Sequence, residues 1–190
     1  MEPFWARLDH VVKVRAPIVA GVVLLSVLVT ALVTAPVRRT PGYAPAQPIA
    51  FSHRLHAGSM RIACQYCHIG VASGRHATVP ASSICMNCHQ VAAVDRPGVA
   101  ALRQQHAAGL PILWERVNRL PDFVYFSHSV HIGRGVPCQT CHGDMTSVDA
   151  AVQVHPLSMG SCLGCHRDPA AQVSGFAGPR GPQNCSACHR

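Results

Sequence analysis

The stretch Cys64-Gln-Tyr-Cys67-His68 decides the fold, because its pattern, two cysteines three positions apart followed at once by histidine, occurs five times in 190 residues. All ten cysteines of the chain belong to these motifs. The pattern C-x-x-C-H is the attachment signature of c-type haem, in which two thiols bond to the porphyrin and the histidine binds its iron. The sequence therefore predicts five covalently bound haem c groups, attached through Cys64 and Cys67, Cys85 and Cys88, Cys138 and Cys141, Cys162 and Cys165, and Cys185 and Cys188.

Zinc sites, disulfides and thioredoxin-like dithiols are the competing interpretations of paired cysteines. A single motif would not separate them from haem. Histidine makes up only 13 of the 190 residues, so five chance followers have a probability of about one in a million by simple multiplication of this composition. We therefore expect the histidines of the motifs to be the proximal iron ligands: His68, His89, His142, His166 and His189.

An uncharged run of 22 residues, 16–37, predicts a transmembrane anchor helix, since that length crosses about 30 Å of hydrocarbon. A cleaved signal peptide is the alternative, but Pro36 directly follows Ala35, the plausible cleavage position. We expect a retained anchor, preceded by a short cytoplasmic segment at residues 1–15.

The orientation follows from the haem chemistry more firmly than from charge. Basic residues flank the run on both sides, so the positive-inside rule gives only a slight preference for a cytoplasmic N-terminus. Because haem is attached to C-x-x-C-H outside the cytoplasmic membrane, the chain after the anchor should lie in the periplasm or at the cell exterior. The expected location is the bacterial inner membrane, crossed once, and His10 would then lie on the wrong side to bind haem iron.

Composition predicts that cofactor replaces a side-chain core. Aromatic residues make up only 5% of the chain, and the apolar anchor inflates the hydrophobic fraction of 48%. The formal net charge is +8, but each ferric haem with its propionates contributes roughly −1, which leaves about +3. Nucleic-acid binding is therefore not supported.

The remaining sequence consists of a linker and a repeat. A Pro-rich linker is expected at 38–50, followed by a pentahaem domain at 51–190. Phe51-Ser-His53-x-x-His56 precedes the first motif, and Phe126-Ser-His128-x-x-His131 precedes the third. We predict a mostly α, loop-rich multihaem cytochrome c domain whose haems form the core. Its parts are two related dihaem halves at 51–95 and 126–168, a helical bridge over 97–116 with a break at Gly109, and a fifth haem at 175–190.

Distal iron ligands must come from the other histidines. The three-residue spacing in each repeat places both imidazoles on one side of a helical turn, slightly offset, so that one can bind its own haem and the other a neighbouring haem. Two histidines on one iron suit electron transfer, whereas an open position suits reactions with small molecules. The expected distal ligands are His53, His56, His76, His128 and His131; His155, Met159 or His106 could replace one of them.

Several of these segments resemble the pentahaem cytochrome c subunit of bacterial alternative complex III. The resemblance is carried by Phe51-Ser-His-x-x-His-Ala-Gly, Cys-x-Tyr-Cys-His, His76-Ala-x-Val-Pro, Cys85-Met-Asn-Cys-His, Leu120-Pro-Asp-Phe-Val-Tyr-Phe-Ser-His, Cys138-Gln-Thr-Cys-His-Gly and Pro156-Leu-Ser-Met-Gly-x-Cys. The haem segments are also similar to class III cytochromes c.

The resemblance implies an electron-relay subunit with no catalytic pocket of its own. Its partners would be a multi-span quinol-binding subunit, an iron–sulfur subunit and, in some complexes, a monohaem cytochrome c. Electrons would leave to a periplasmic cytochrome c or similar carrier, or to a terminal oxidase. A self-sufficient membrane quinol dehydrogenase feeding a periplasmic reductase is the alternative function. A multihaem enzyme is disfavoured, because it needs an open haem and a distal acid–base group.

Overall fold

The computed structural model describes residues 5, 9, 11–34 and 41–189, which fall into two units, 1–37 and 38–190. The expectations for most of the cytoplasmic segment, for the cleavage position at Ala35 and Pro36, and for the first linker residues lie outside the described residues. Each unit is described by itself.

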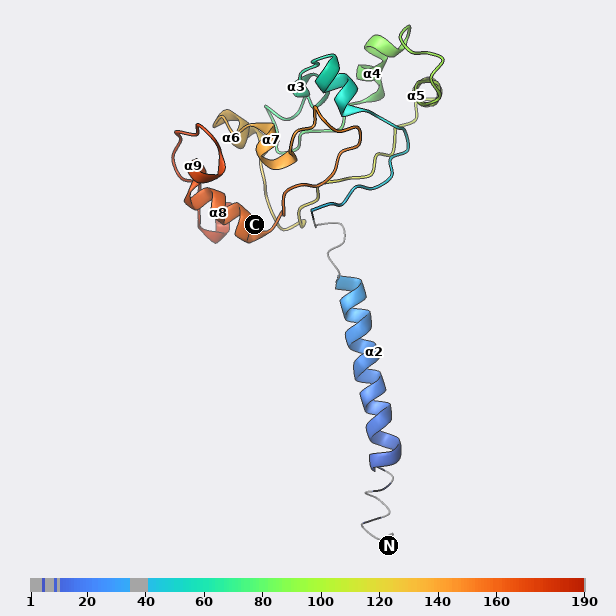
Figure 1. Cartoon of the computed structure of the whole chain (residues 1–190), viewed down its shortest axis with the longest axis vertical. Helices are drawn as coiled ribbons and strands as arrows, with labels where there is room; N and C mark the ends of the chain where they lie inside the picture. Colours follow the sequence, from blue (N-terminus) through green and yellow to red (C-terminus); the bar gives the residue numbers. More distant parts are fainter. Residues whose placement is uncertain (1–4, 6–8, 10, 35–40, 190) are drawn as a thin grey trace. The chain divides into compact units, whose positions relative to one another are not determined.

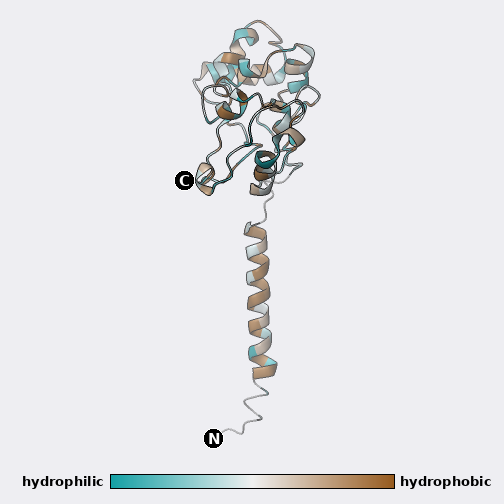
Figure 2. Ribbon diagram, turned by 90° about the vertical axis from the view of Figure 1, so that its left-hand side faces the viewer, coloured by the Kyte–Doolittle hydropathy of each residue, from teal (hydrophilic) through white to brown (hydrophobic). Residues whose placement is uncertain are grey.

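The N-terminal unit is one continuous helical segment. A π-helical turn, η1 (Val11–Arg15), leads into α2 (Ala16–Thr34). Together they form a 24-residue segment, Val11–Thr34, that is long and apolar enough to cross a membrane. Its apolar side chains are exposed, and Figure 2 shows α2 coloured hydrophobic along nearly its whole length. The predicted apolar helix is confirmed, and the segment begins at Val11, five residues before the uncharged run.

The C-terminal unit is a chain of short helices joined by long loops, and four of the five motifs lie within α-helices. The fifth lies in a 3₁₀ turn, and the described residues contain no β-strand. The elements are η3 (Arg54–Ser59), α3 (Cys64–Cys67), α4 (Ser82–His89), α5 (Pro97–Ala107), α6 (His128–Gly133), α7 (Cys138–His142), α8 (Met159–Arg167), α9 (Pro169–Gln172) and η4 (Cys185–Ala187). This confirms the mostly helical, loop-rich fold.

The bridge between the halves is helical only up to the break predicted at Gly109. Helix α5 ends at Ala107, and residues 110–116 are not helical, although the sequence predicts a helix there. Gly109 has a φ of +67°, which a residue inside an α-helix does not adopt. Pro111 then follows and could not continue the helix. The bridge is therefore one helix followed by an extended segment.

The two halves hold each other through reciprocal backbone hydrogen bonds at the start of the two His-x-x-His turns. The N–H of His53 donates to the carbonyl of Asp149 (3.1 Å), and the N–H of His128 donates to the carbonyl of Arg75 (3.2 Å). The next residue in each half adds a second bond, Arg54 to Val148 (2.8 Å) and Ser129 to Gly74 (3.1 Å). The loop that follows the first motif of each half thus fixes the histidine turn of the other.

Side chains supply little of the core of this unit. Among the described residues, the buried apolar side chains are Val71, Met86, Leu102 and Val173. Burying such a side chain contributes about 2 kcal/mol each, which is far below the entropy lost when a chain of this length is ordered. A core of this size is consistent with haem as the main filling of the domain.

Leu102 is the side-chain anchor of α5, at 6% exposure. Leu102→Ala is expected to lower the free energy of unfolding by about 2–5 kcal/mol, because it leaves a cavity where α5 packs. Guanidinium unfolding of the haem-loaded protein measures the change. Val91→Ala, at a position that is 85% exposed, is the matched control and should change stability by less than about 0.5 kcal/mol. Equal losses in both variants would contradict the packing role of Leu102.

Candidate haem-binding sites

Motifs one, three and five each start a helical turn directly after a residue with extended backbone, whereas motifs two and four lie inside α4 and α8. The residues before the first cysteines are Ala63, Pro137 and Asn184 in motifs one, three and five, with ψ of 141°, 147° and 147°. In a helical turn, side chains three positions apart lie on the same face. The local structure therefore presents both thiols of a motif side by side, as attachment to one porphyrin requires.

Three of the five motif histidines are oriented by a backbone carbonyl at Nδ1. Thr78 O lies 2.7 Å from Nδ1 of His68, Ala92 O lies 3.0 Å from that of His89, and Pro182 O lies 2.7 Å from that of His166. A backbone carbonyl at Nδ1 fixes the tautomer with the proton on Nδ1 and leaves Nε2 with its lone pair free. This is the state of an imidazole that binds iron, so these residues fit haem.

Histidines of the two His-x-x-His turns are oriented in the same way, by a backbone carbonyl near Nδ1. Nδ1 of His56 lies 2.8 Å from Ser52 O, and Nδ1 of His131 lies 2.8 Å from Ser127 O, four residues back in each case. Nδ1 of His128 lies 2.8 Å from Arg75 O in the opposite half. The exception is His53, whose Nδ1 is buried with no hydrogen-bond partner of normal geometry.

Three histidines of these turns lie opposite three motif histidines. The ring centroids are 6.1 Å apart for His56 and His89, 6.3 Å for His128 and His142, and 6.0 Å for His131 and His166. Two imidazoles on opposite faces of one iron have centroids about 6 Å apart, since each iron–nitrogen bond is about 2 Å and each ring centre lies about 1 Å further out. The spacing therefore fits one iron between each pair.

Two of these pairs join histidines whose nearest motif in the sequence is a different one. His56 precedes motif one but lies opposite His89 of motif two, and His131 precedes motif three but lies opposite His166 of motif four. Each of these two histidines therefore lies opposite the second motif of its own half.

The phenylalanine of each repeat braces its two histidines, a role that sequence reasoning missed. Phe51 stacks on His56 with centroids 4.5 Å apart, and Phe126 stacks on His131 at 4.4 Å. Each ring also meets the other histidine edge-on, at 4.9 Å for His53 and 4.8 Å for His128. The available signal was the recurrence of Phe-Ser before both histidine pairs.

Burial shifts the pKa of several histidines and cysteines of the sites. It lowers the pKa of His53, His131 and His142, which keeps these imidazoles neutral and able to bind iron. It raises the pKa of the Cys67, Cys85, Cys138, Cys141 and Cys162 thiols. Within the described ranges, no cluster of three or more His, Cys, Asp or Glu side chains could hold a metal ion.

Thiols of different motifs lie near one another, and these contacts indicate which motifs are neighbours in space. After burial, the next cause of the raised pKa is a thiol of another motif in four cases: Cys85 for Cys67, Cys64 for Cys138, Cys165 for Cys141, and Cys188 for Cys162. Motif one therefore lies beside two and three, three beside four, and four beside five. Figure 1 shows the same progression, from α4 through α3 and α7 to α8.

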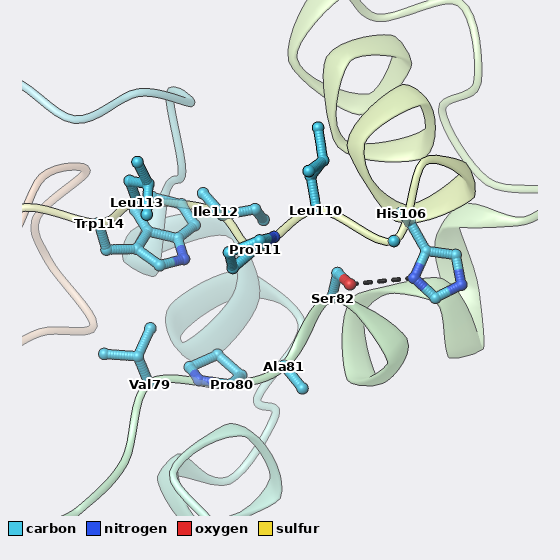
Figure 3. Close-up of a pocket in the computed structure, with 11 residues that line it drawn as sticks. Val79, Pro80, Ala81, Ser82, His106, Leu110, Pro111, Ile112, Leu113 and Trp114 are labelled. Carbon is cyan, nitrogen blue, oxygen red and sulfur yellow. Dashed lines mark hydrogen bonds between the residues drawn. The ribbon is translucent and has the colours of Figure 1, made fainter.

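The other histidines named as candidates lie apart from these pairs. His76 is exposed. His155 is half-buried, with Nδ1 3.1 Å from its neighbour's carbonyl, Pro156 O. His106 is exposed on α5, and its Nδ1 lies 2.9 Å from the hydroxyl of Ser82, a contact that joins α5 to the start of α4. Figure 3 shows this contact at the edge of an apolar hollow lined by Val79, Pro80, Ile112, Leu113 and Trp114. An apolar hollow beside α4 suits a porphyrin face.

The family described as cytochrome c7 and related cytochrome c matches residues 124–190. The chain carries a cytochrome c7-like multihaem domain. It is 26% identical over 165 residues to the multiheme cytochrome c subunit of menaquinone reductase from Nitratidesulfovibrio vulgaris (strain Hildenborough), an alignment that covers 76% of this chain and 77% of the relative. The cytochrome c7 match spans the second half and the fifth motif, whereas the relative also aligns with much of the rest of the chain.

Proposed function

We propose that this multihaem cytochrome c relays electrons within a membrane respiratory complex, between the quinone pool and a periplasmic carrier. The observation that carries the proposal is the set of three imidazole pairs, each spaced for one iron: His56 with His89, His128 with His142 and His131 with His166. Thiol contacts between neighbouring motifs support the order two, one, three, four, five. When bound, haem supplies one-electron cycling between ferrous and ferric iron. The chain's own residues hold five such groups in sequence, and two of the motifs, the second and the fifth, are the ends of the relay.

The ligands that we propose follow the ring pairs. His56 would serve with His89, His128 with His142, and His131 with His166. His53 would serve with His68, because His68 is one of the charges that, after burial, lower the pKa of His53 and is therefore close to it. Closing an iron with two histidines favours electron transfer over binding of small molecules. Four of the five motifs would thus be pure relay stations.

The complex that we propose is of the alternative complex III type. The sequence resemblance supports it, and so does the relative, which is itself a subunit of a quinone-linked enzyme. The N-terminal segment Val11–Thr34 would be a retained anchor in the inner membrane, with the haem domain in the periplasm. The expected partners are a multi-span quinol-binding subunit, an iron–sulfur subunit and a monohaem cytochrome c, with a soluble cytochrome c or a terminal oxidase downstream.

Purification of a C-terminally tagged chain from mildly solubilised native membranes tests this membership. Mass spectrometry should identify a multi-span subunit and a large iron–sulfur protein in the same particle. Recovery of the cytochrome alone, able to oxidise quinol unaided, would contradict the relay and support the self-sufficient quinol dehydrogenase.

Electron flow toward the quinone is the second candidate function, because the relative is named a menaquinone reductase. An order of motifs has no direction of its own, so the same residues could serve either flow. The purified particle distinguishes the two directions. Haem reduction by added quinol that proceeds to a periplasmic acceptor supports quinol oxidation, whereas quinone reduction from a reduced periplasmic carrier supports the reverse.

The proposed ligand pairs predict distinct electron paramagnetic resonance (EPR) signals, because the ring planes differ. The planes of His56 and His89 are inclined by 60°, whereas those of His128 and His142 differ by only 12°. Ferric haem with nearly parallel imidazoles gives an ordinary rhombic low-spin spectrum, and strongly inclined imidazoles give a low-spin signal with an unusually large maximum g value. His56→Ala is expected to remove the large-g signal. Its matched control, His131→Ala, should remove a rhombic signal, and loss of the same signal in both variants would contradict the pairing.

A further inference from the structure

We propose that Asn118 is a positioning residue of the third haem, whose side-chain amide holds the imidazole of His142 and sets the midpoint potential of that haem. The inference rests on the proposed function, because it takes His142 and His128 as the two ligands of one iron. It assigns a role in electron transfer to a residue that lies outside the five motifs and the two His-x-x-His turns.

The first observation is the contact between the two side chains. Nδ2 of Asn118 lies 3.3 Å from Nδ1 of His142, and both residues are half-buried. When Nε2 of a histidine binds iron, its Nδ1 carries a proton and needs an acceptor. The oxygen and nitrogen of an amide exchange places by a half-turn of the side chain. The carbonyl oxygen of Asn118 is therefore in position to accept from Nδ1–H of His142.

The second observation is that this histidine is held differently from three others. Nδ1 of His68, His89 and His166 lies near a backbone carbonyl of a residue that follows the motif. At His142 the partner is a side chain that lies 24 positions earlier in the chain. A backbone carbonyl is present whatever the residue, whereas a side-chain acceptor depends on the residue type. The hydrogen bond at His142 can therefore be removed by a single substitution.

The third observation is that the backbone near Asn118 is fixed by the segment that leads to Phe51. Nε2 of Gln47 donates to the carbonyl of Glu115, and the N–H of Glu115 donates to Oε1 of Gln47, both at 3.0 Å. Asn118 lies in the bend that follows Glu115. Because this segment is already held, the amide needs little further ordering to bond the imidazole, as a side chain that orients a ligand requires.

The contact has a direct consequence for the potential of the third haem. A hydrogen bond from Nδ1–H makes an imidazole a stronger donor to iron, which favours the ferric state and lowers the midpoint potential. On the other side of the same iron, Nδ1 of His128 lies 2.8 Å from the carbonyl of Arg75. Motif three lies between motifs one and four. An electron that crosses the relay must therefore pass the site that Asn118 adjusts.

Redox titration of the full-length holoprotein, followed by EPR, tests the role of the amide. Asn118→Leu keeps the side-chain volume and removes the acceptor, so the midpoint potential of one haem should rise. The expected change is about tenfold in the ferrous-to-ferric ratio, which corresponds to about 59 mV for a one-electron couple. Asn118→Asp keeps the shape and supplies a charged acceptor, so it should lower the same potential.

The EPR signal that moves identifies the haem. It should be a rhombic signal, since the ring planes of His128 and His142 differ by only 12°. The large-g signal of the His56 and His89 pair should keep its potential. The matched control is Val117→Ala, which changes a half-buried neighbour in the same bend and keeps the amide. This variant should leave all five potentials unchanged.

Three results would overturn the inference. The first is Asn118→Leu protein in which no potential moves. The second is a shift of the same sign in Asn118→Leu and Asn118→Asp, which a merely structural role of the amide would produce. The third is movement of the large-g signal alone. If Asn118→Leu protein loses haem, the isosteric Asn118→Asp protein decides, and an unchanged potential there contradicts the role.

Haem content, measured separately as the pyridine adduct, distinguishes these results from failure of the proposed function. Wild-type protein with fewer than five haems contradicts the attachment on which both proposals rest. Wild-type protein with five haems, combined with potentials that do not respond at Asn118, contradicts only the role of the amide and leaves the relay intact.

Discussion

Removal of the third motif by Cys138→Ala and Cys141→Ala is expected to divide the relay into two isolated pairs. Four haems would remain, those of motifs two and one on one side and those of motifs four and five on the other. Because electron tunnelling falls steeply with distance, electrons that enter one pair should not reach the other on the timescale of turnover. Half of the remaining haem should therefore be reduced rapidly, at whichever end the quinone partner docks.

Stopped-flow absorbance of the membrane complex mixed with quinol measures this fraction. The matched control is Cys185→Ala with Cys188→Ala, which removes an end of the relay. There the four remaining haems should all be reduced rapidly or none should, depending on which end receives the electrons. Rapid reduction of all four haems in the third-motif variant would show a branched arrangement and contradict the linear order. His128→Met offers a check with five haems still attached, since a Met ligand raises the potential of the middle haem and should make it retain electrons.

The largest expected effect on stability is that of haem itself. Chain produced without the haem-attachment machinery should fail to fold beyond the N-terminal helix. The few buried apolar side chains, Val71, Met86, Leu102 and Val173, cannot offset the entropy of ordering residues 41–189. Cofactor binding is then inseparable from folding, as in small metal-dependent domains.

Far-ultraviolet circular dichroism with a thermal scan tests this dependence. The apoprotein in detergent should keep the helix of Val11–Thr34 and show no cooperative transition. The holoprotein should melt cooperatively, and limited proteolysis should degrade only the apoprotein after about residue 40. A cooperative transition in the apoprotein would show that side chains alone form the core.

The sequence predicts the local parts of the sites because the residues of each part lie only a few positions apart. The five C-x-x-C-H motifs and the two His-x-x-His turns are readable without tertiary structure. Start signals predict the helix that begins at Pro97, and Gly109 predicts the break after which α5 has ended at Ala107. The predicted continuation to Arg116 is wrong, because residues 110–116 are not helical. The apolar anchor was predicted from length and charge, and its helix extends back to Val11.

Contacts between distant segments could not be predicted from the sequence. The hydrogen bonds from His53 to Asp149 and from His128 to Arg75 join residues through backbone groups, which every residue carries. The same holds for the bridge that brings Phe123 to His189. No side-chain pattern in the sequence predicts such pairings. The ring that lies opposite each motif histidine can therefore be identified only from the three-dimensional structure.

The intact mass of the mature chain, purified under reducing and denaturing conditions, shows whether all five motifs carry covalent haem. Covalent haem survives this treatment, whereas zinc and disulfides do not. We expect a mass equal to the polypeptide plus five haems, with the anchor retained. A mass equal to the polypeptide alone, or to the polypeptide with fewer haems, would contradict a relay built on all five motifs.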